Sequence, residues 1–241
     1  MTSTASSVYH PAGSRGAADH GWLQAKHTFS FGQYHESERM HFGVLRVLND
    51  DIVAPGAGFS KHPHDNMEII TIPLRGQLAH KDSLGNGETI HAGEIQIMSA
   101  GTGIEHSEFN PSHEEAVNLL QIWVFPNRRN VEPRYQTIPV VQQDGQVFQQ
   151  IVSPNPQDAG GWIHQNAWFH LANLKAGGRA TYELHEEANG VYVFVISGSI
   201  EIEGQVLTER DGFGIWSVES FEMICQADAR VLLMEVPMGF E

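Results

Sequence analysis

Short apolar segments constrain the fold of this chain more than any other feature. They have the length of strands rather than helices and contain many Val, Ile, Phe and Trp residues. The clearest are His41–Leu48, Met67–Leu74, Glu94–Met98, Asn118–Phe125, Val191–Ile196 and Val231–Val236. Glycine turn signals such as Gly85-Asn86-Gly87 separate them at the spacing typical of sandwiches and barrels. Because no long segment with a helical period competes, the sequence predicts an all-β fold.

The 241 residues suffice for one large β domain or for two of about 100 residues each. A faint internal repeat favours two, because His64–Gly76 resembles His185–Gly198, and each apolar run ends at a glycine turn. Between the copies, Pro126–Pro133 is polar and rich in proline, as linkers are. We therefore predict an N-terminal domain at residues 1–130 and a C-terminal domain at residues 131–241.

Two short pairs of residues have the spacing of metal ligands. They are His62-Pro63-His64 and His106-Ser107-Glu108. Side chains at i and i+2 of a strand point to the same face, so two such pairs on facing strands would surround one cation. Three imidazoles and one carboxylate suit a divalent transition metal and leave two octahedral positions open. Open positions indicate catalysis rather than a purely structural site.

The second repeat copy has only His185 where the first has a histidine pair, so we expect metal in the N-terminal half alone. Gly101-Thr102-Gly103 lacks the lysine and helix of a phosphate loop, and we expect a tight turn that brings His106 to the metal. The remaining histidines are expected to be solvated or hydrogen-bonded rather than ligands. They include His27, His80, His91, His113, His164 and His170.

Composition excludes several partners. With 14 basic and 29 acidic residues the formal charge is -15, which disfavours direct binding to nucleic acids and anionic membranes. Cys225 is the only cysteine and cannot form an intrachain disulfide; we expect it to be a small buried hydrophobe. Residues 1–20 contain no signal-peptide core, and no run approaches the roughly 18 apolar residues that span a bilayer. We expect a soluble, cytoplasmic protein.

The first half resembles a cupin. The cupin pattern places H-x-H-x3-E before a glycine and a later glycine-rich turn before a third histidine. The strings H-T-F-S-F-G-Q-Y, F-S-K-H-P-H-D-N-M-E and A-G-E-I-Q-I-M-S-A-G-T-G-I-E-H-S-E are similar to those of the pirin family, including bacterial pirin-like quercetin 2,3-dioxygenases. The resemblance implies a bicupin of two tandem jelly-roll-like β-barrels that face each other. It also implies that His62, His64, His106 and Glu108 hold the metal in the first barrel, with Glu108 rather than Glu68 as the acidic ligand.

The resemblance further implies a quercetin 2,3-dioxygenase, which cleaves a flavonol with O2 and releases carbon monoxide. Fe(II) suits the mixed nitrogen and oxygen donors, and Cu, Ni, Co, Mn or Zn could occupy the same residues. Glu108 is also a candidate general base. His41, Phe42, Phe59 and Met67 either line a flat pocket or belong to the core.

Two other functions remain open. Pirins are associated with the redox-dependent binding of transcription factors or metabolic enzymes, and an acidic surface permits such protein partners. A metal-activated hydrolase or isomerase would use the same ligands. Two fused barrels can supply internally the packing that cupin dimers obtain between chains, so we expect a monomer.

Overall fold

The computed structural model describes residues 5–141 and 145–240, and strands dominate it. These ranges contain no α-helix, only the 3-10 helices η1 (Ala12–Ser14) and η2 (Ser37–Arg39). None of the described helices is long and apolar enough to cross a membrane. All six predicted apolar runs contain strand residues, although the first becomes a strand only at Leu45. The predicted all-β fold is confirmed.

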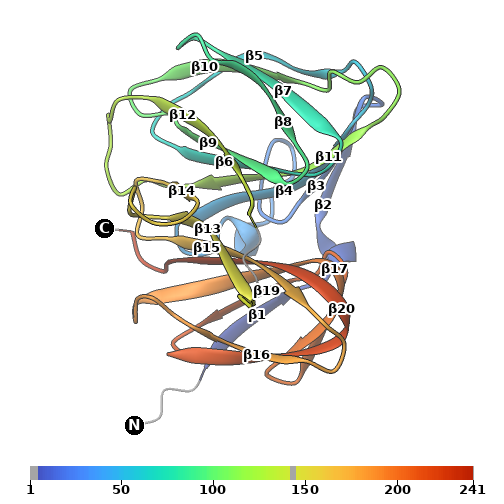
Figure 1. Cartoon of the computed structure of the whole chain (residues 1–241), viewed down its shortest axis with the longest axis vertical. Helices are drawn as coiled ribbons and strands as arrows, with labels where there is room; N and C mark the ends of the chain where they lie inside the picture. The colour runs from blue at the N-terminus through green and yellow to red at the C-terminus, as the bar shows by residue number, and fades with distance from the viewer. Residues whose placement is uncertain (1–4, 142–144, 241) are drawn as a thin grey trace.

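Two sheets enclose the N-terminal half. The seven-stranded sheet has the order β12-β9-β6-β11-β4-β3-β2, and the four-stranded sheet has the order β5-β10-β7-β8. Figure 1 shows them in the upper part of the molecule as the two walls of a barrel. The strands are β2 (Gly16–Asp19), β3 (Leu23–His27), β4 (Leu45–Val53), β5 (Gly58–His64), β6 (Glu68–Arg75), β7 (Gln77–Asp82), β8 (Gly87–His91), β9 (Glu94–Ser99), β10 (Ile104–Phe109), β11 (Val117–Val124) and β12 (Arg134–Pro139).

A nine-stranded sheet forms the C-terminal half. Its main order is β1-β19-β17-β20-β15-β13-β14, with β16 paired to β20 and β18 paired to β17. The long strands β17 and β20 join the two walls of the lower barrel in Figure 1, because each pairs with different strands along its length. The strands are β1 (Ser6–His10), β13 (Phe148–Ser153), β14 (Gly161–Trp162), β15 (Trp168–Leu174), β16 (Arg179–Glu183), β17 (Asn189–Ile202), β18 (Gln205–Thr208), β19 (Gly212–Trp216) and β20 (Ser220–Pro237).

Two strands cross the division at residue 130. Strand β1 lies at the edge of the C-terminal sheet, where Ser6 is opposite Trp216. Strand β12 lies at the edge of the N-terminal sheet, where Arg134 is opposite Ser99. Each half thus contributes one strand to the sheet of the other. Domains at residues 1–130 and 131–241 remain a prediction, and the hydrogen-bonded sheets do not divide the chain at that point.

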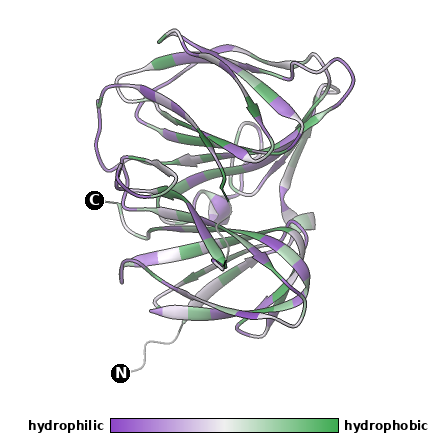
Figure 2. Ribbon diagram, in the orientation of Figure 1, coloured by the Kyte–Doolittle hydropathy of each residue, from purple (hydrophilic) through white to green (hydrophobic). Residues whose placement is uncertain are grey.

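The two large sheets pack against each other through one apolar layer that contains residues of both halves, among them Ile70, Leu120, Phe169 and Met234. Figure 2 shows hydrophobic and hydrophilic residues alternating along many strands, as expected for sheets with two different faces. The C-terminal barrel has a largely apolar interior that includes Cys225, which is 2% exposed as predicted. The N-terminal barrel instead buries many polar side chains. They include Asn49, Asp51, Thr71, His80, Gln96, His106 and Glu108.

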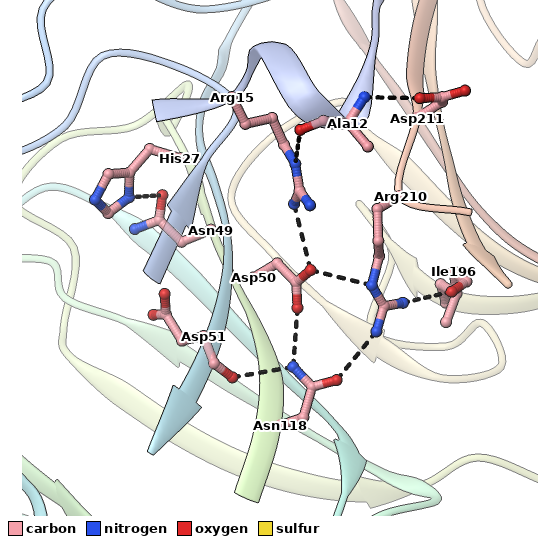
Figure 3. A network of polar contacts seen from close by, with 10 residues as sticks. All are labelled: Ala12, Arg15, His27, Asn49, Asp50, Asp51, Asn118, Ile196, Arg210 and Asp211. Atoms are coloured by element: carbon pink, nitrogen blue, oxygen red, sulfur yellow. Dashed lines mark hydrogen bonds and ion pairs between the residues drawn. The ribbon is translucent and has the colours of Figure 1, made fainter. Parts of the chain in front are cut away.

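A polar network joins the two halves where this apolar layer ends (Figure 3). Asp50 Oδ2 accepts a hydrogen bond from Arg15 Nη1 at 3.3 Å and forms an ion pair with Arg210, whose Nε lies 3.0 Å away. Asn118 donates to Asp50 Oδ1 at 2.8 Å and accepts from Arg210 at 3.1 Å. Arg210 lies in the turn between β18 and β19, so this single carboxylate binds together segments from distant parts of the chain.

Candidate metal centre

Three histidines converge in the wall formed by β5 and β10. These strands are antiparallel neighbours with His106 directly opposite His62, so the two ligand pairs lie on adjacent strands of one sheet. The ring centroids are 4.4 Å apart for His62 and His106, 4.8 Å for His62 and His64, and 4.9 Å for His64 and His106. One donor nitrogen from each ring lies within 4.8 Å of the others. The alternation of a strand explains why His62 and His64 share this face.

His106 is the most constrained of the three. It is 1% exposed, and neither Nδ1 nor Nε2 has a hydrogen-bond partner among the described residues. Leaving a buried polar group unsatisfied costs about 1–3 kcal/mol. A metal ion would accept a lone pair from this ring and remove part of that cost, so the residues present fit a metal.

Glu108 extends the cluster into the barrel. Its side chain is buried, and Oε2 accepts a hydrogen bond from Gln121 at 3.0 Å while Oε1 has no partner among the described residues. Burial raises the pKa of Glu108 to about 7, although the hydrogen bond from Gln121 and the nearby polar side chains of Gln96 and Thr71 oppose this effect. A nearby cation would offset the cost of burying its charge.

The imidazoles are held in the form that binds metals. Burial, reinforced by the neighbouring histidines, lowers the pKa of His106 to about 3, and burial followed by the effect of His62 lowers that of His64 to about 4. Both rings are therefore neutral near pH 7. His62 Nδ1 donates to the carbonyl of Ser60 at 2.8 Å, which leaves Nε2 as the free lone pair. The indole of Trp123 packs edge-on against His64 at 4.9 Å.

His80 also belongs to this region, and sequence reasoning did not assign it there. A donor atom of His80 lies within 4.8 Å of those of His106 and Glu108, and His80 is the cross-strand neighbour of Glu108. Its Nε2 is 3.1 Å from Asp82 Oδ2, and its ring stacks on Tyr135 at 4.3 Å. The segment His80-Lys81-Asp82 has the same i, i+2 spacing as the ligand pairs, and this was the available signal.

The other acidic candidate lies apart from the histidines. Glu68 accepts a hydrogen bond from the Ser99 hydroxyl at 2.6 Å and belongs to neither cluster of potential donors in the described ranges. Asn66, with φ of 44°, bends the chain between His64 and Glu68. The expected turn before His106 is also present, since Gly101 has φ of 49° and Gly103 has φ of 136°. A side chain at Gly101 would meet the carbonyl oxygen of Val131.

An open hollow of about 360 Å³ adjoins the cluster. Its wall includes His62, Trp22, Phe59 and Phe109, and the Trp22 and Phe59 rings meet edge-on at 5.2 Å. Of the four residues considered for a pocket, only Phe59 lines this hollow.

The other three residues lie elsewhere. Phe42 is buried 5.5 Å from Tyr192 in the layer between the halves, because the chain turns toward the C-terminal barrel before β4. His41 contacts Phe240, and Met67 packs on the cluster that contains Ile69. None of these three side chains is among the residues that line the hollow beside His62.

The fold and the cluster together define a two-barrel cupin protein with a histidine-rich centre in its first barrel. Residues 9–124 match the family described as Pirin, and residues 150–236 match the family described as Quercetinase C-terminal cupin domain. The chain belongs to the pirin family, as the sequence motifs indicated.

Relatives match almost the whole chain. A protein named quercetin 2,3-dioxygenase from Escherichia coli is 40% identical over 226 residues, which are 94% of this chain and 96% of that protein. A pirin-like protein from Caulobacter vibrioides is 40% identical over 222 residues, 91% of this chain and 95% of that one.

Solved structures agree. YhhW from Escherichia coli superposes with a TM-score of 0.93 at 38% identity, and the match covers 98% of this chain and 100% of YhhW. The same bacterial pirin in complex with nickel(II) superposes with a TM-score of 0.91 at 39% identity, covering 96% and 99%. The predicted bicupin architecture is thereby confirmed.

Proposed function

We propose that His62, His64, His106 and Glu108 bind one divalent transition metal, and that the chain is a metal-dependent dioxygenase acting on flavonols such as quercetin. The observation that carries this proposal is the buried ring of His106. Within residues 5–141 and 145–240 its two nitrogens have no hydrogen-bond partner, and two imidazoles and a half-satisfied carboxylate lie beside it. The nickel complex of one relative and the quercetin 2,3-dioxygenase name of another support it.

The donor set agrees with the metals expected. Neutral imidazoles with one carboxylate suit Fe(II) and also accept Ni, Co, Mn, Cu or Zn. We propose Fe(II) as the physiological ion, with nickel as a competent replacement. When bound, the ion would supply positive charge that favours the anionic form of a flavonol 3-hydroxyl.

Glu108 is the candidate to receive the proton of that hydroxyl. Gln121 fixes Oε2 by its hydrogen bond at 3.0 Å, and Oε1 has no partner in the described part of the chain. Burial raises the pKa of Glu108 in the metal-free centre, and a bound cation would lower it again, so the carboxylate would be ionised and able to accept the proton. Glu108 would then bind the metal and act as general base once its bond to the metal lengthens.

The hollow beside His62 would hold the rings of the substrate. The Trp22, Phe59 and Phe109 side chains present aromatic surface there, and Phe109 is 41% exposed although it is apolar. A flat aromatic body can cover these rings, while His62 forms the edge of the hollow nearest the other histidines. In the proposed reaction, ring cleavage inserts both atoms of O2, releases one carbon as carbon monoxide and leaves a depside ester.

Carbon monoxide release and oxygen uptake test the proposal, measured after Fe(II)-loaded or Ni(II)-loaded protein is mixed with quercetin in air. We expect the carbon monoxide released and the oxygen taken up to equal the quercetin consumed, and we expect both signals to be lost in His106→Ala. Glu108→Gln should keep part of the metal, measured by elemental analysis, and lose most of the turnover. Protein that retains metal but releases no carbon monoxide would overturn the dioxygenase proposal. Unchanged turnover in Glu108→Gln would reject Glu108 as the base.

A further inference from the structure

His185, the lone histidine of the second repeat, lies in a second polar cluster within the C-terminal barrel. Its Nδ1 donates to Glu235 Oε2 at 2.7 Å. Glu235 is completely buried and also accepts hydrogen bonds from the Tyr182 hydroxyl and the Asn189 amide, both at 2.9 Å. The backbone N–H groups of His185 and Glu186 complete its shell at 2.8 and 3.1 Å. A buried carboxylate whose hydrogen bonds are all satisfied requires a specific arrangement of the surrounding donors.

Strand pairing places this cluster where the first barrel has its metal centre. His64 ends β5 and is followed by β6, and His185 follows β16 and precedes β17. In the first barrel, Trp123 on β11 is paired with a residue near the start of β6 and contacts His64. In the second barrel, Glu235 on β20 is paired with a residue near the start of β17 and contacts His185. The cluster thus occupies the corresponding end of the second barrel, with different chemistry.

The hydrogen bonds set the protonation of two imidazoles. Burial raises the pKa of Glu235, but the hydrogen bonds from His185, Asn189 and Tyr182 outweigh burial and hold that pKa below its ordinary value. The ionised carboxylate only accepts, so His185 Nδ1 and the Tyr182 hydroxyl donate. The Tyr182 oxygen then accepts from His170 Nδ1 at 3.1 Å. Both rings therefore carry a proton at Nδ1, and neither Nε2 has a partner among the described residues.

A cavity of about 740 Å³ opens in front of these rings. Trp168, His170 and His185 line one part of it, and Trp168 lies parallel to His185 at 4.6 Å. Apolar side chains such as Ile138 and Phe148 line another part. The volume lies within the range of small-molecule sites, which combine apolar walls with a few convergent polar groups.

The charge of the site selects among ligands. No lysine or arginine belongs to the described lining, and the ionised Glu235 lies behind the histidines, so an anion is disfavoured. A protonated amine would need a carboxylate oxygen beside the imidazoles, yet five donors already occupy those of Glu235. The other carboxylate of the lining, Asp158, is exposed in the turn after β13 and already accepts a hydrogen bond from Asn155 at 3.0 Å. The groups beside Trp168 are imidazole nitrogens that accept hydrogen bonds, and the rest of the lining consists of glutamine and apolar side chains. They fit a neutral planar molecule with an acidic hydroxyl.

We infer that this cavity is a second small-molecule site, which binds a phenol through a hydrogen bond from its hydroxyl to Nε2 of His185 or His170. The ionised Glu235 strengthens the bond, because it polarises His185 through Nδ1. The histidines that accept this hydrogen bond both belong to the second barrel, so the site does not depend on the proposed metal centre.

Calorimetric titration of the full chain with 4-nitrophenol and 4-nitroanisole, at a pH low enough to keep the phenol neutral, tests the inference. The two probes have nearly the same shape, and only the phenol donates a hydrogen bond. We expect saturable binding of 4-nitrophenol to metal-free wild-type protein and to His106→Ala, and binding of 4-nitroanisole that is at least about tenfold weaker. His185→Gln should weaken the binding of 4-nitrophenol by a similar factor. His91→Gln, on an exposed ring of the first barrel, is the matched control.

A second measurement needs no substitution. Long-range nitrogen–proton spectra of histidine-labelled protein should contain two rings protonated at Nδ1 whose unprotonated Nε2 signals shift when 4-nitrophenol is added. Equal affinity for the two probes, or binding that His106→Ala abolishes and His185→Gln leaves intact, would overturn the inference. A metal ion retained by His106→Ala and lost in His185→Gln would also overturn it, since the nitrogens would then bind metal.

Discussion

Replacing Asp50 with Asn should strongly destabilise the protein. Asp50 Oδ2 is shared by Arg15 at 3.3 Å and Arg210 at 3.0 Å, and the three side chains are only 10%, 6% and 20% exposed. Breaking a buried ion pair by removing one partner costs about 3–5 kcal/mol, because the remaining charge stays desolvated. We therefore expect the free energy of unfolding to fall by about 3–5 kcal/mol. For a chain of this size the melting temperature would fall by roughly 6–20 °C.

Urea unfolding followed by tryptophan fluorescence measures this loss. Glu222→Gln is a suitable control, because Glu222 pairs with Arg179 at 2.6 Å in an exposed position. Exposed pairs contribute little, so this variant should unfold at the midpoint of the wild type. Arg15→Met should cost less than Asp50→Asn, since Asp50 keeps Arg210. A loss below about 1 kcal/mol for Asp50→Asn would refute the argument that this carboxylate holds the two halves together.

Three further predictions concern the metal, pH and a turn. When the free metal concentration is about 100 times its Kd, adding a chelator should lower the free energy of unfolding by about 2.7 kcal/mol. Thermal melts with and without chelator measure this loss, and His106→Ala should not show it. Burial lowers the pKa of His170 from 6.5 to about 4, so the native state resists protonation and stability falls as pH drops from about 6.5 to 4. His170→Asn should remove about 3 kcal/mol of that fall, measured by urea unfolding at both pH values; an unchanged slope would contradict the assigned pKa. Gly101→Ala should cost at least about 2 kcal/mol, because φ is 49° and the new carbon would meet the Val131 carbonyl; a variant of wild-type stability would show that the turn relaxes.

The strands could be predicted because their signal is local. Alternating burial in β3 and runs of β-branched residues in β17 are visible within a few residues of sequence. The exchange of β1 and β12 was not predictable in this way. Which strand pairs with Ser6–His10 depends on the packing of residues far along the chain, and nothing within that segment encodes its partner.

The candidate site shows the same limit. The i, i+2 spacing correctly implies that His62 and His64 share a face, since strand geometry is short-ranged. It does not reveal that β5 and β10 are neighbours or that His80 lies opposite Glu108, because register is set by the whole barrel. Burial also decides the pKa of Glu108, and burial is a property of the folded state.

The exchanged strand β1 has a consequence for synthesis of the protein. Ser6 finds its partner Trp216 only after nearly the whole chain exists, so at about 5–20 residues per second β1 waits roughly 10–40 s on the ribosome. During that time its backbone groups are free to pair with other chains. The segment Ser6–His10 contains two serines and a histidine among five residues, which limits its tendency to aggregate while it waits. The nine-stranded sheet therefore closes late, with a strand that was made long before its neighbour β19.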